Sequence, residues 1–195
     1  MCFHLNKFDY KPIISVHNQI KSYMKDTITP TNVEITVPDD KILVTKTDPE
    51  GIISYVNSEF IKLSGYSESE LLGKQHNISR HPDMPRVIFK LLWDILKNNR
   101  EFNGYFKNMS KNGDYYWGFV NVTPIFSIDN ELLGYNSIWR QANADKLNYI
   151  QNLYHELLEI EQQSSSSDGV EEAQFKLDSV LNGREKGYDE FILTI

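Results

Sequence analysis

Three strand-like runs follow one another past the middle of the chain, with only short polar connections between them. They cover Phe102–Met109, Tyr115–Phe126 and Leu132–Gln141. The first connection contains Asn112-Gly113 and the second contains Asp129-Asn130, residue pairs that favour tight hairpin turns. Connections this short join neighbouring antiparallel strands, because parallel strands need a crossover of a dozen or more residues. The sequence therefore predicts an antiparallel meander.

Two shorter strand-like runs, at residues 42–45 and 52–56, precede the meander. Between them stands Asp48-Pro49-Glu50-Gly51, in which proline presets φ and glycine relieves the exit from a turn. These runs predict a β-hairpin. Together with the meander they give a five-stranded antiparallel sheet whose helices are grouped between the second and third strands, an α+β fold.

Helix signals fill the interval between the hairpin and the meander. Asn57 is expected to cap one helix, which Gly65 ends. Ser67 and Glu70 have the spacing of a capping box and predict a second, short helix. Apolar residues recur at helical spacing over residues 86–97, so a third helix, largely buried, is expected there.

The chain is expected to extend beyond this domain at both ends. Apolar residues at helical spacing predict an N-terminal helical extension within residues 1–40, covered either by this domain or by a second copy of the chain. The domain is expected over residues 41–143, and an interaction helix with near-heptad apolar spacing over residues 144–163. Residues 164–195 are expected to form a flexible serine-rich linker, a short helix and an apolar tail.

Composition argues against several classes of function. The 195 residues include 20 Lys+Arg and 27 Asp+Glu, a formal net charge of −7, and no basic cluster, so nucleic-acid binding is disfavoured. There is no apolar run of about 18 residues and no leader pattern, so we expect a cytoplasmic protein without direct membrane insertion. The single cysteine, Cys2, cannot form an internal disulfide.

A loop with two closely spaced prolines is the most distinctive local motif. It reads His-Asn-Ile-Ser-Arg-His-Pro-Asp-Met-Pro from His76 to Pro85. The prolines restrict the backbone, which lowers the cost of ordering the loop around a ligand. Arg80 offers a planar guanidinium suited to paired oxygens, and Trp93 on the following helix could stack on an aromatic ring.

The alternative interpretation of this loop, without a ligand, is a surface ion pair. Arg80 and Asp83 would then face solvent with His81, while Trp93 would belong to the core. The histidines of the loop lack the spacing and the cysteine partners of a zinc site, so no metal site is expected. Trp117 and Trp139 lie in strand runs and are interpreted first as core residues, although either could line a cofactor pocket.

Together these motifs resemble those of a PAS domain. The resemblance covers residues 41–141 and rests on the hairpin, on the run from Asn57 to Gly73, and on Lys-Asn-Gly-Asp-x-Tyr-Trp from Lys111 to Trp117. The His76–Pro85 loop is similar to that of the aerotaxis-receptor type of PAS domain. The resemblance implies the PAS fold, with helices on one face of the five-stranded sheet. It also implies noncovalently bound FAD, which senses redox or energy state for chemotaxis-type signalling, and no enzymatic activity.

The resemblance further indicates which residues bind the cofactor. In the family, the arginine, the second histidine and the aspartate of the loop are tied to FAD binding. The candidates in this chain are Asn77, Arg80, His81, Asp83, Trp93 and Asn108. The segment from His76 to Arg80 has no cysteine, whereas light-sensing flavin PAS domains form a covalent photoadduct with a cysteine near this position, so no such adduct is expected.

The signalling partner is expected to be a separate protein. Aerotaxis receptors continue into membrane helices and a signalling region that this sequence lacks, so the resemblance implies a chemoreceptor signalling protein, membrane-bound or cytoplasmic. Two alternatives stay open. One is a homodimeric PAS adaptor that binds haem, another small ligand or no cofactor, and the other is a flavoenzyme, for which the sequence shows neither a nucleophile–base pair nor a nicotinamide-binding motif.

Overall fold

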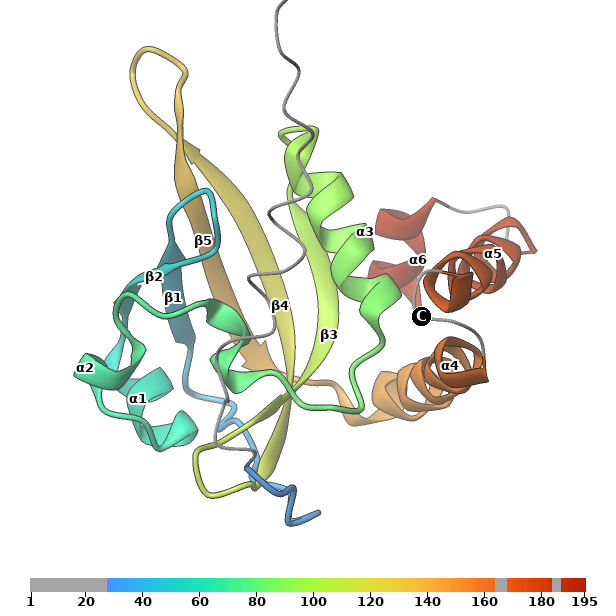
Figure 1. The fold of residues 1–195 in the computed structure, drawn as a ribbon, viewed down its shortest axis with the longest axis horizontal. Coiled ribbons are helices and arrows are strands. Elements are labelled where there is room, and N and C mark those ends of the chain that lie inside the picture. Colours follow the sequence, from blue (N-terminus) through green and yellow to red (C-terminus); the bar gives the residue numbers. More distant parts are fainter. Residues whose placement is uncertain (1–27, 164–167, 184–186) are drawn as a thin grey trace, which may run out of the picture.

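Five strands form one antiparallel sheet in the computed structural model, which describes residues 28–163, 168–183 and 187–195 (Figure 1). The strands are β1 (Leu43–Thr47), β2 (Ile53–Val56), β3 (Phe102–Met109), β4 (Tyr115–Phe126) and β5 (Leu132–Gln141). Their order across the sheet is β2-β1-β5-β4-β3, so the last strand of the meander lies in the centre beside the hairpin. The predicted five-stranded α+β fold is confirmed.

Helices cover one face of this sheet. Those inserted between β2 and β3 are α1 (Ser58–Ser64), α2 (Glu68–Leu71), the 3-10 helix η2 (His76–Ser79) and α3 (Arg86–Lys97). In Figure 1, α1 and α2 lie on the side of β1 and β2, whereas α3 lies in front of β3. The core is the apolar layer between these helices and the sheet, where Phe60, Ile88 and Phe102 are fully buried.

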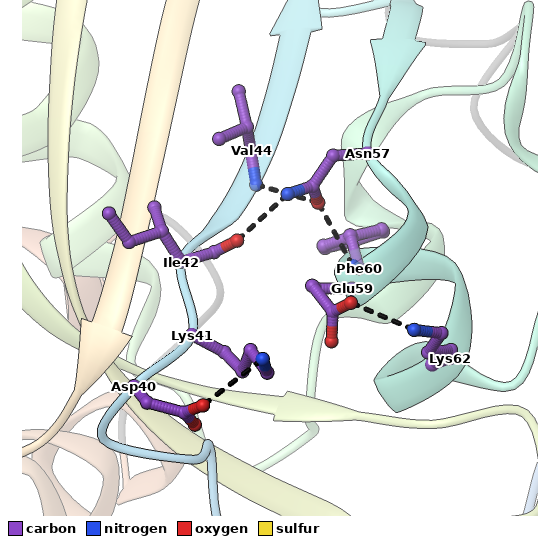
Figure 2. A network of polar contacts seen from close by, with 8 residues as sticks. All are labelled: Asp40, Lys41, Ile42, Val44, Asn57, Glu59, Phe60 and Lys62. Carbon is purple, nitrogen blue, oxygen red and sulfur yellow. Dashed lines mark hydrogen bonds and ion pairs between the residues drawn. The ribbon is translucent and has the colours of Figure 1, made fainter.

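Asn57 joins the first helix to the first strand (Figure 2). Its Oδ1 accepts hydrogen bonds from the backbone N–H groups of Phe60 and Val44, each at 3.0 Å. Its Nδ2 donates to the carbonyl of Ile42 at 2.8 Å. The predicted cap of α1 is therefore confirmed, and the same side chain also fixes α1 to β1. Gly65 ends α1 as expected, in the left-handed conformation with φ 71°.

Three further helices follow the sheet: α4 (Ala144–Gln163), α5 (Asp168–Asn182) and α6 (Tyr188–Thr194). They lie together beside α3 and the β3 edge of the sheet (Figure 1). The interaction helix expected from residue 144 is α4, and the short helix expected near the C-terminus is α5. None of the helices in the described part of the chain is both long and apolar enough to cross a membrane.

The C-terminal tail differs from the expectation. Phe191 and Ile192 of α6 are each 1% exposed, and Tyr188 stacks on Phe102 of β3 with the ring centroids 5.5 Å apart. The segment expected as a loose tail is thus a helix packed on the domain, because its apolar residues gather on one side of α6. The linker at residues 164–167 lies outside the described residues, and the proposed division into domains stays a prediction.

The N-terminal extension is not helical where it is described. Residues 28–40 form an irregular segment, and its part around Ile35 lies beside the start of β4, where the Ile35 N–H donates to the Tyr115 carbonyl at 2.7 Å. Pro30 and Pro38, one near each end of this segment, disfavour a helix there. The expected N-terminal helix falls within residues 1–27, outside the described residues.

Candidate functional site

A cavity of about 220 Å³ lies between the sheet and its helical cover. The sheet contributes Phe106, Asn108, Val120, Val122, Tyr135, Ser137 and Trp139, and the helical side contributes His76, Asn77, Arg80, Phe89, Leu92, Trp93 and Leu96. The wall is mainly apolar and aromatic, with a few polar groups, as is usual for a small-molecule site. Its volume is below the ~300–1,000 Å³ of sites that enclose drug-sized ligands. It therefore suits one ring system better than a whole dinucleotide.

The repeat of side-chain directions, in the strands and in helix α3, explains why these residues line the wall. Every second residue of a strand faces the same side, so Tyr135, Ser137 and Trp139 of β5 all line the cavity. On α3 the lining residues fall at i, i+3, i+4 and i+7, which is one helix face. They are Phe89, Leu92, Trp93 and Leu96.

Arg80 lies in the cavity wall, at the edge of the sheet. Its guanidinium lies 4.0 Å from the centre of the Phe89 ring, and its Nη2 donates to the Met84 carbonyl at 2.9 Å. The backbone of Arg80 forms an antiparallel bridge with Asn108 of β3. Burial lowers the pKa of the guanidinium, while the nearby carboxylate of Glu161 opposes this effect. The structure thus presents a partly desolvated cation to the cavity.

His81 and Asp83 lie outside the cavity. Because Arg80 is extended and paired with β3, the next side chain points to the opposite side. His81 is 1% exposed, packs on the ring of Tyr115 at 5.9 Å, and accepts the Asp83 N–H on Nδ1 at 3.1 Å. The Asp83 carboxylate pairs with Lys107 at 2.7 Å. These two side chains hold the loop against β3 rather than lining the cavity.

The remaining three candidates border the cavity. Trp93 contacts Tyr135 edge to face, with the ring centroids 5.6 Å apart. Asn108 is 4% exposed, and its Nδ2 donates to the Tyr116 hydroxyl at 3.4 Å. Asn77 is an exposed member of the wall, on η2. Four of the six candidate residues thus meet around one space, and their role in binding stays a prediction.

Two further wall residues were not among the candidates. His76 lies between Phe60 and Trp139, and its Nε2 is 2.8 Å from the Thr45 hydroxyl. Burial lowers the pKa of this imidazole to about 4. Trp139, first interpreted as a core residue, has a buried Nε1 with no hydrogen-bond partner among the described residues. The alternation along β5 is the signal that places it in the wall, whereas Trp117 packs against Tyr154 of α4.

Within the described ranges, no three histidine, cysteine, aspartate or glutamate side chains are grouped so that they could hold a metal ion.

The imidazole of His81 is disfavoured in its charged form. Burial, reinforced by the charge of Lys107 and opposed by Asp83, lowers the pKa of its imidazole to about 4. The ring is therefore neutral near pH 7, with Nδ1 as an acceptor and Nε2 as the donor.

The order of the strands, the helical cover and the cavity between them define the class of domain. Residues 53–138 match the family described as PAS fold. The chain therefore contains a PAS domain, as the motifs of the hairpin and the meander indicated.

Among known proteins, the chain is similar to the aerotaxis receptor of Escherichia coli (strain K12). The two are 38% identical over 119 residues, which is 61% of this chain and 23% of the receptor. This chain is also similar to the nitrogen fixation regulatory protein of Klebsiella pneumoniae. The two are 26% identical over 103 residues, which is 53% of this chain and 21% of that protein. The chain thus spans less than a quarter of the length of these two relatives.

Solved structures of light-oxygen-voltage proteins share the fold. One is a domain studied with a flavin analogue, with a TM-score of 0.50 and 18% identity, covering 59% of this chain and 87% of that chain. Another is an RNA-binding light-oxygen-voltage receptor, with a TM-score of 0.51 and 18% identity, covering 59% of this chain and 33% of that chain. At this level of identity the likeness concerns the fold alone.

Proposed function

We propose that this PAS domain binds FAD noncovalently through its cavity and reports the redox state of the flavin to a signalling partner. The observation that carries the proposal is the aromatic cavity bordered by the half-buried cation of Arg80. The 38% identity to the aerotaxis receptor, whose type of PAS domain the His76–Pro85 loop resembles, supports the choice of ligand.

The wall suits a flavin ring in its chemistry. Trp93, Tyr135 and Trp139 supply aromatic surface for a planar ligand. A ring carbonyl or ring nitrogen of a ligand would give the Trp139 Nε1–H the acceptor that it lacks among the described residues. An oxygen at another edge of the ligand would accept from the Arg80 guanidinium, which binds oxygens in pairs.

The size of the cavity indicates which part of FAD it would enclose. The space suits the isoalloxazine ring, while the ribityl chain and the nucleotide would have to leave it. Gln75 and Asn77 are exposed wall residues on the same side, so this is the opening through which they would leave. When bound, the flavin supplies reversible electron transfer. The protein would hold the ring, exclude water from it and place donors at its edge.

We further propose that the protein works in the cytoplasm with a chemoreceptor signalling partner and has no enzymatic activity of its own. The relatives named as a receptor and as a regulatory protein support a sensing role. The only cysteine of the chain is Cys2, and the part of the cavity wall that the described residues form holds no cysteine for a photoadduct.

A visible absorption spectrum of the purified protein tests the proposal. We expect a flavin spectrum, either as isolated or after incubation with FAD, that bleaches with dithionite and recovers in air. Parallel incubations with FMN and riboflavin would show whether the adenine part adds affinity. A colourless protein after all three incubations would refute flavin binding. A Soret band would instead favour the haem-binding alternative, and a colourless dimer would favour the adaptor.

A further inference from the structure

Glu161 is a buried carboxylate on α4 that lies outside the cavity. The residue is 4% exposed, although it belongs to a helix at the edge of the domain. Its Oε1 accepts the backbone N–H of Val87 at 2.8 Å, and its Oε2 accepts the backbone N–H of Arg86 at 2.9 Å. The same Oε2 is 3.1 Å from Nε of Arg86. Burying a charge in this way is costly unless the charge is fully paired, so these three contacts are needed to offset the cost of desolvating the carboxylate.

The carboxylate takes the place of a helix cap. Helix α3 begins at Arg86, and the preceding residue, Pro85, has no side chain that could accept a hydrogen bond. The first backbone N–H groups of a helix need an acceptor and favour a negative charge. Glu161 meets both needs from another helix, so the C-terminal end of α4 holds the N-terminal end of α3.

This contact lies next to the cavity wall. Helix α3 carries Phe89, Leu92 and Trp93 of the wall. Phe89 in turn lies under the guanidinium of Arg80 at 4.0 Å. The charge of Glu161 also acts on Arg80, since it raises the pKa that burial lowers. A displacement of α3, or a change at Arg80, therefore reaches Glu161 through packing and through charge.

Helix α5 meets the backbone of the same residue. Gly169, in the first turn of α5, is so close to α4 that a Cβ placed on it would lie 2.7 Å from the Glu161 carbonyl oxygen and 3.0 Å from its Cα. There is no space here for another side chain. The backbone of Glu161 is thus one place where α5 packs on α4, and its side chain accepts the first N–H groups of α3.

We propose that Glu161 is a positioning residue that couples the cavity to the C-terminal helices. Its carboxylate holds the cavity helix α3 at a defined position, and its backbone supports α5. A change in the cavity wall is thereby transmitted to α4 and α5, and the packing of α5 acts back on the cavity. The sensory meaning of this coupling rests on the proposed function, but the coupling itself requires no flavin.

Hydrogen exchange, read by mass spectrometry on peptides of α5, tests the coupling. Leu92→Ala perturbs the cavity wall without touching Glu161. It should raise the exchange rate in α5 by about fivefold or more in the otherwise wild-type protein, at the lower end of usual coupling strengths. Glu161→Gln should abolish this response. Glu156→Gln is the matched control and should retain it, because Glu156 joins α4 to α5 through an exposed ion pair with Lys176 at 2.8 Å.

Each outcome decides the proposal. If Leu92→Ala has no effect on α5, the cavity is not coupled to the helices. If its effect persists with Glu161→Gln, the coupling runs through direct packing of α3 on α5 instead. Should Glu161→Gln fail to fold, Glu161→Asp replaces it, because a side chain shorter by one methylene cannot reach the backbone N–H groups of both Arg86 and Val87. The coupling is then refuted if the response to Leu92→Ala is as large in Glu161→Asp as in wild type.

A second experiment measures the same exchange in the presence of FAD. If FAD binds, it should slow exchange in α5 of the wild-type protein, and Glu161→Gln should abolish this slowing. Equal slowing by FAD in wild type and Glu161→Gln would overturn the coupling. Failure of FAD to bind would instead refute the proposed function, and the Leu92→Ala comparison would still decide the role of Glu161.

Discussion

Arg80 and Phe89 lie face to face in the cavity wall, with the guanidinium carbon 4.0 Å from the centre of the ring. The arginine comes from the proline-containing loop and the phenylalanine from α3, so this contact joins the two elements that close the cavity against the sheet. A stacked guanidinium keeps its in-plane N–H donors available for a ligand. The contact therefore orients Arg80 for binding as well as stabilising the wall.

Arg80→Ala should lower the affinity for FAD by at least about tenfold, because hydrogen bonds to a charged group contribute about 1.5–3 kcal/mol. Arg80→Lys should fall between wild type and Arg80→Ala, since an ammonium keeps the charge but neither stacks on Phe89 nor forms paired bonds. Titration of the apoprotein with FAD measures both. Arg140→Ala, at an exposed position of β5, is the control and should bind as wild type does. Full retention of FAD by Arg80→Ala would remove Arg80 from the site.

Asn57→Ala should lower the free energy of unfolding by about 2–3 kcal/mol. The change removes a helix cap, which contributes about 1 kcal/mol, and two further hydrogen bonds, to Ile42 and Val44, each of similar size. Asn57→Asp should lose less, because a carboxylate still accepts from Val44 and Phe60 and only the donation to Ile42 disappears. Urea unfolding followed by circular dichroism gives the values.

The neighbouring pair of Asp40 and Lys41 supplies the control for Asn57 (Figure 2). Their side chains are exposed and 3.1 Å apart. Surface ion pairs of this kind contribute little, so Lys41→Ala should leave stability unchanged within error. Equal stability of Asn57→Ala and Lys41→Ala would contradict a structural role for Asn57.

Much of the fold could be predicted because its signals are local. The alternation of β4 and β5 and the turn residues around Gly113 lie within a few positions of one another, and the strand bounds from Tyr115 to Phe126 agree with the sequence pattern. The tail around Phe191 could not be predicted as a packed helix. A run of five residues is too short to show a helical period, and its burial depends on contacts with β3 that are distant in sequence.

The candidate site was predictable only in part, for a related reason. Sequence order places Arg80 and His81 side by side, but the structure places them on opposite sides of the sheet edge, because the backbone of Arg80 pairs with Asn108. That pairing joins residues 28 positions apart, so the sequence of the loop contains no signal for it. Glu161 was missed for the same cause, since a glutamate on a helix is normally interpreted as a solvated residue.

Gly134→Ala should destabilise the protein by more than about 3 kcal/mol, a loss found only where a structure cannot adjust. Gly134 has φ 144°, and an added Cβ would lie 1.9 Å from the Thr47 carbonyl oxygen of the neighbouring strand. Either β5 or β1 would have to move. Gly73→Ala is the matched comparison, because Gly73 also has positive φ, at 74°, but has open space around it.

The comparison separates steric conflict from backbone strain at these two glycines. Gly73→Ala should lose only about 1–2 kcal/mol, the cost of a left-handed conformation for a residue with a Cβ. Thermal or urea unfolding of both variants measures the difference. Losses of the same size at both positions would contradict the close approach of β5 to Thr47.

The stability of the protein should fall as the pH drops from 6.5 toward 4, because of His76 and His81. Burial lowers the pKa of each imidazole from 6.5 to about 4 in the folded state. An unfolded chain therefore takes up protons in this range before the folded chain does. The stabilisation is fully present above pH 6.5 and is lost as the pH approaches 4, by about 3 kcal/mol for His76.

His76→Gln isolates this effect, since an amide can still bond to the Thr45 hydroxyl but does not titrate. We expect its unfolding free energy to vary less than that of wild type between pH 6.5 and 4.5. Glu70→Gln is the control: hydrogen bonds from Lys111 and Ser67 lower the pKa of this carboxyl from 4.5 to about 2, so this change should alter the pH dependence of stability only below about pH 4.5. If His76→Gln retains the wild-type pH dependence over that window, the His76 ring is solvated, and the cavity is open to water at that end.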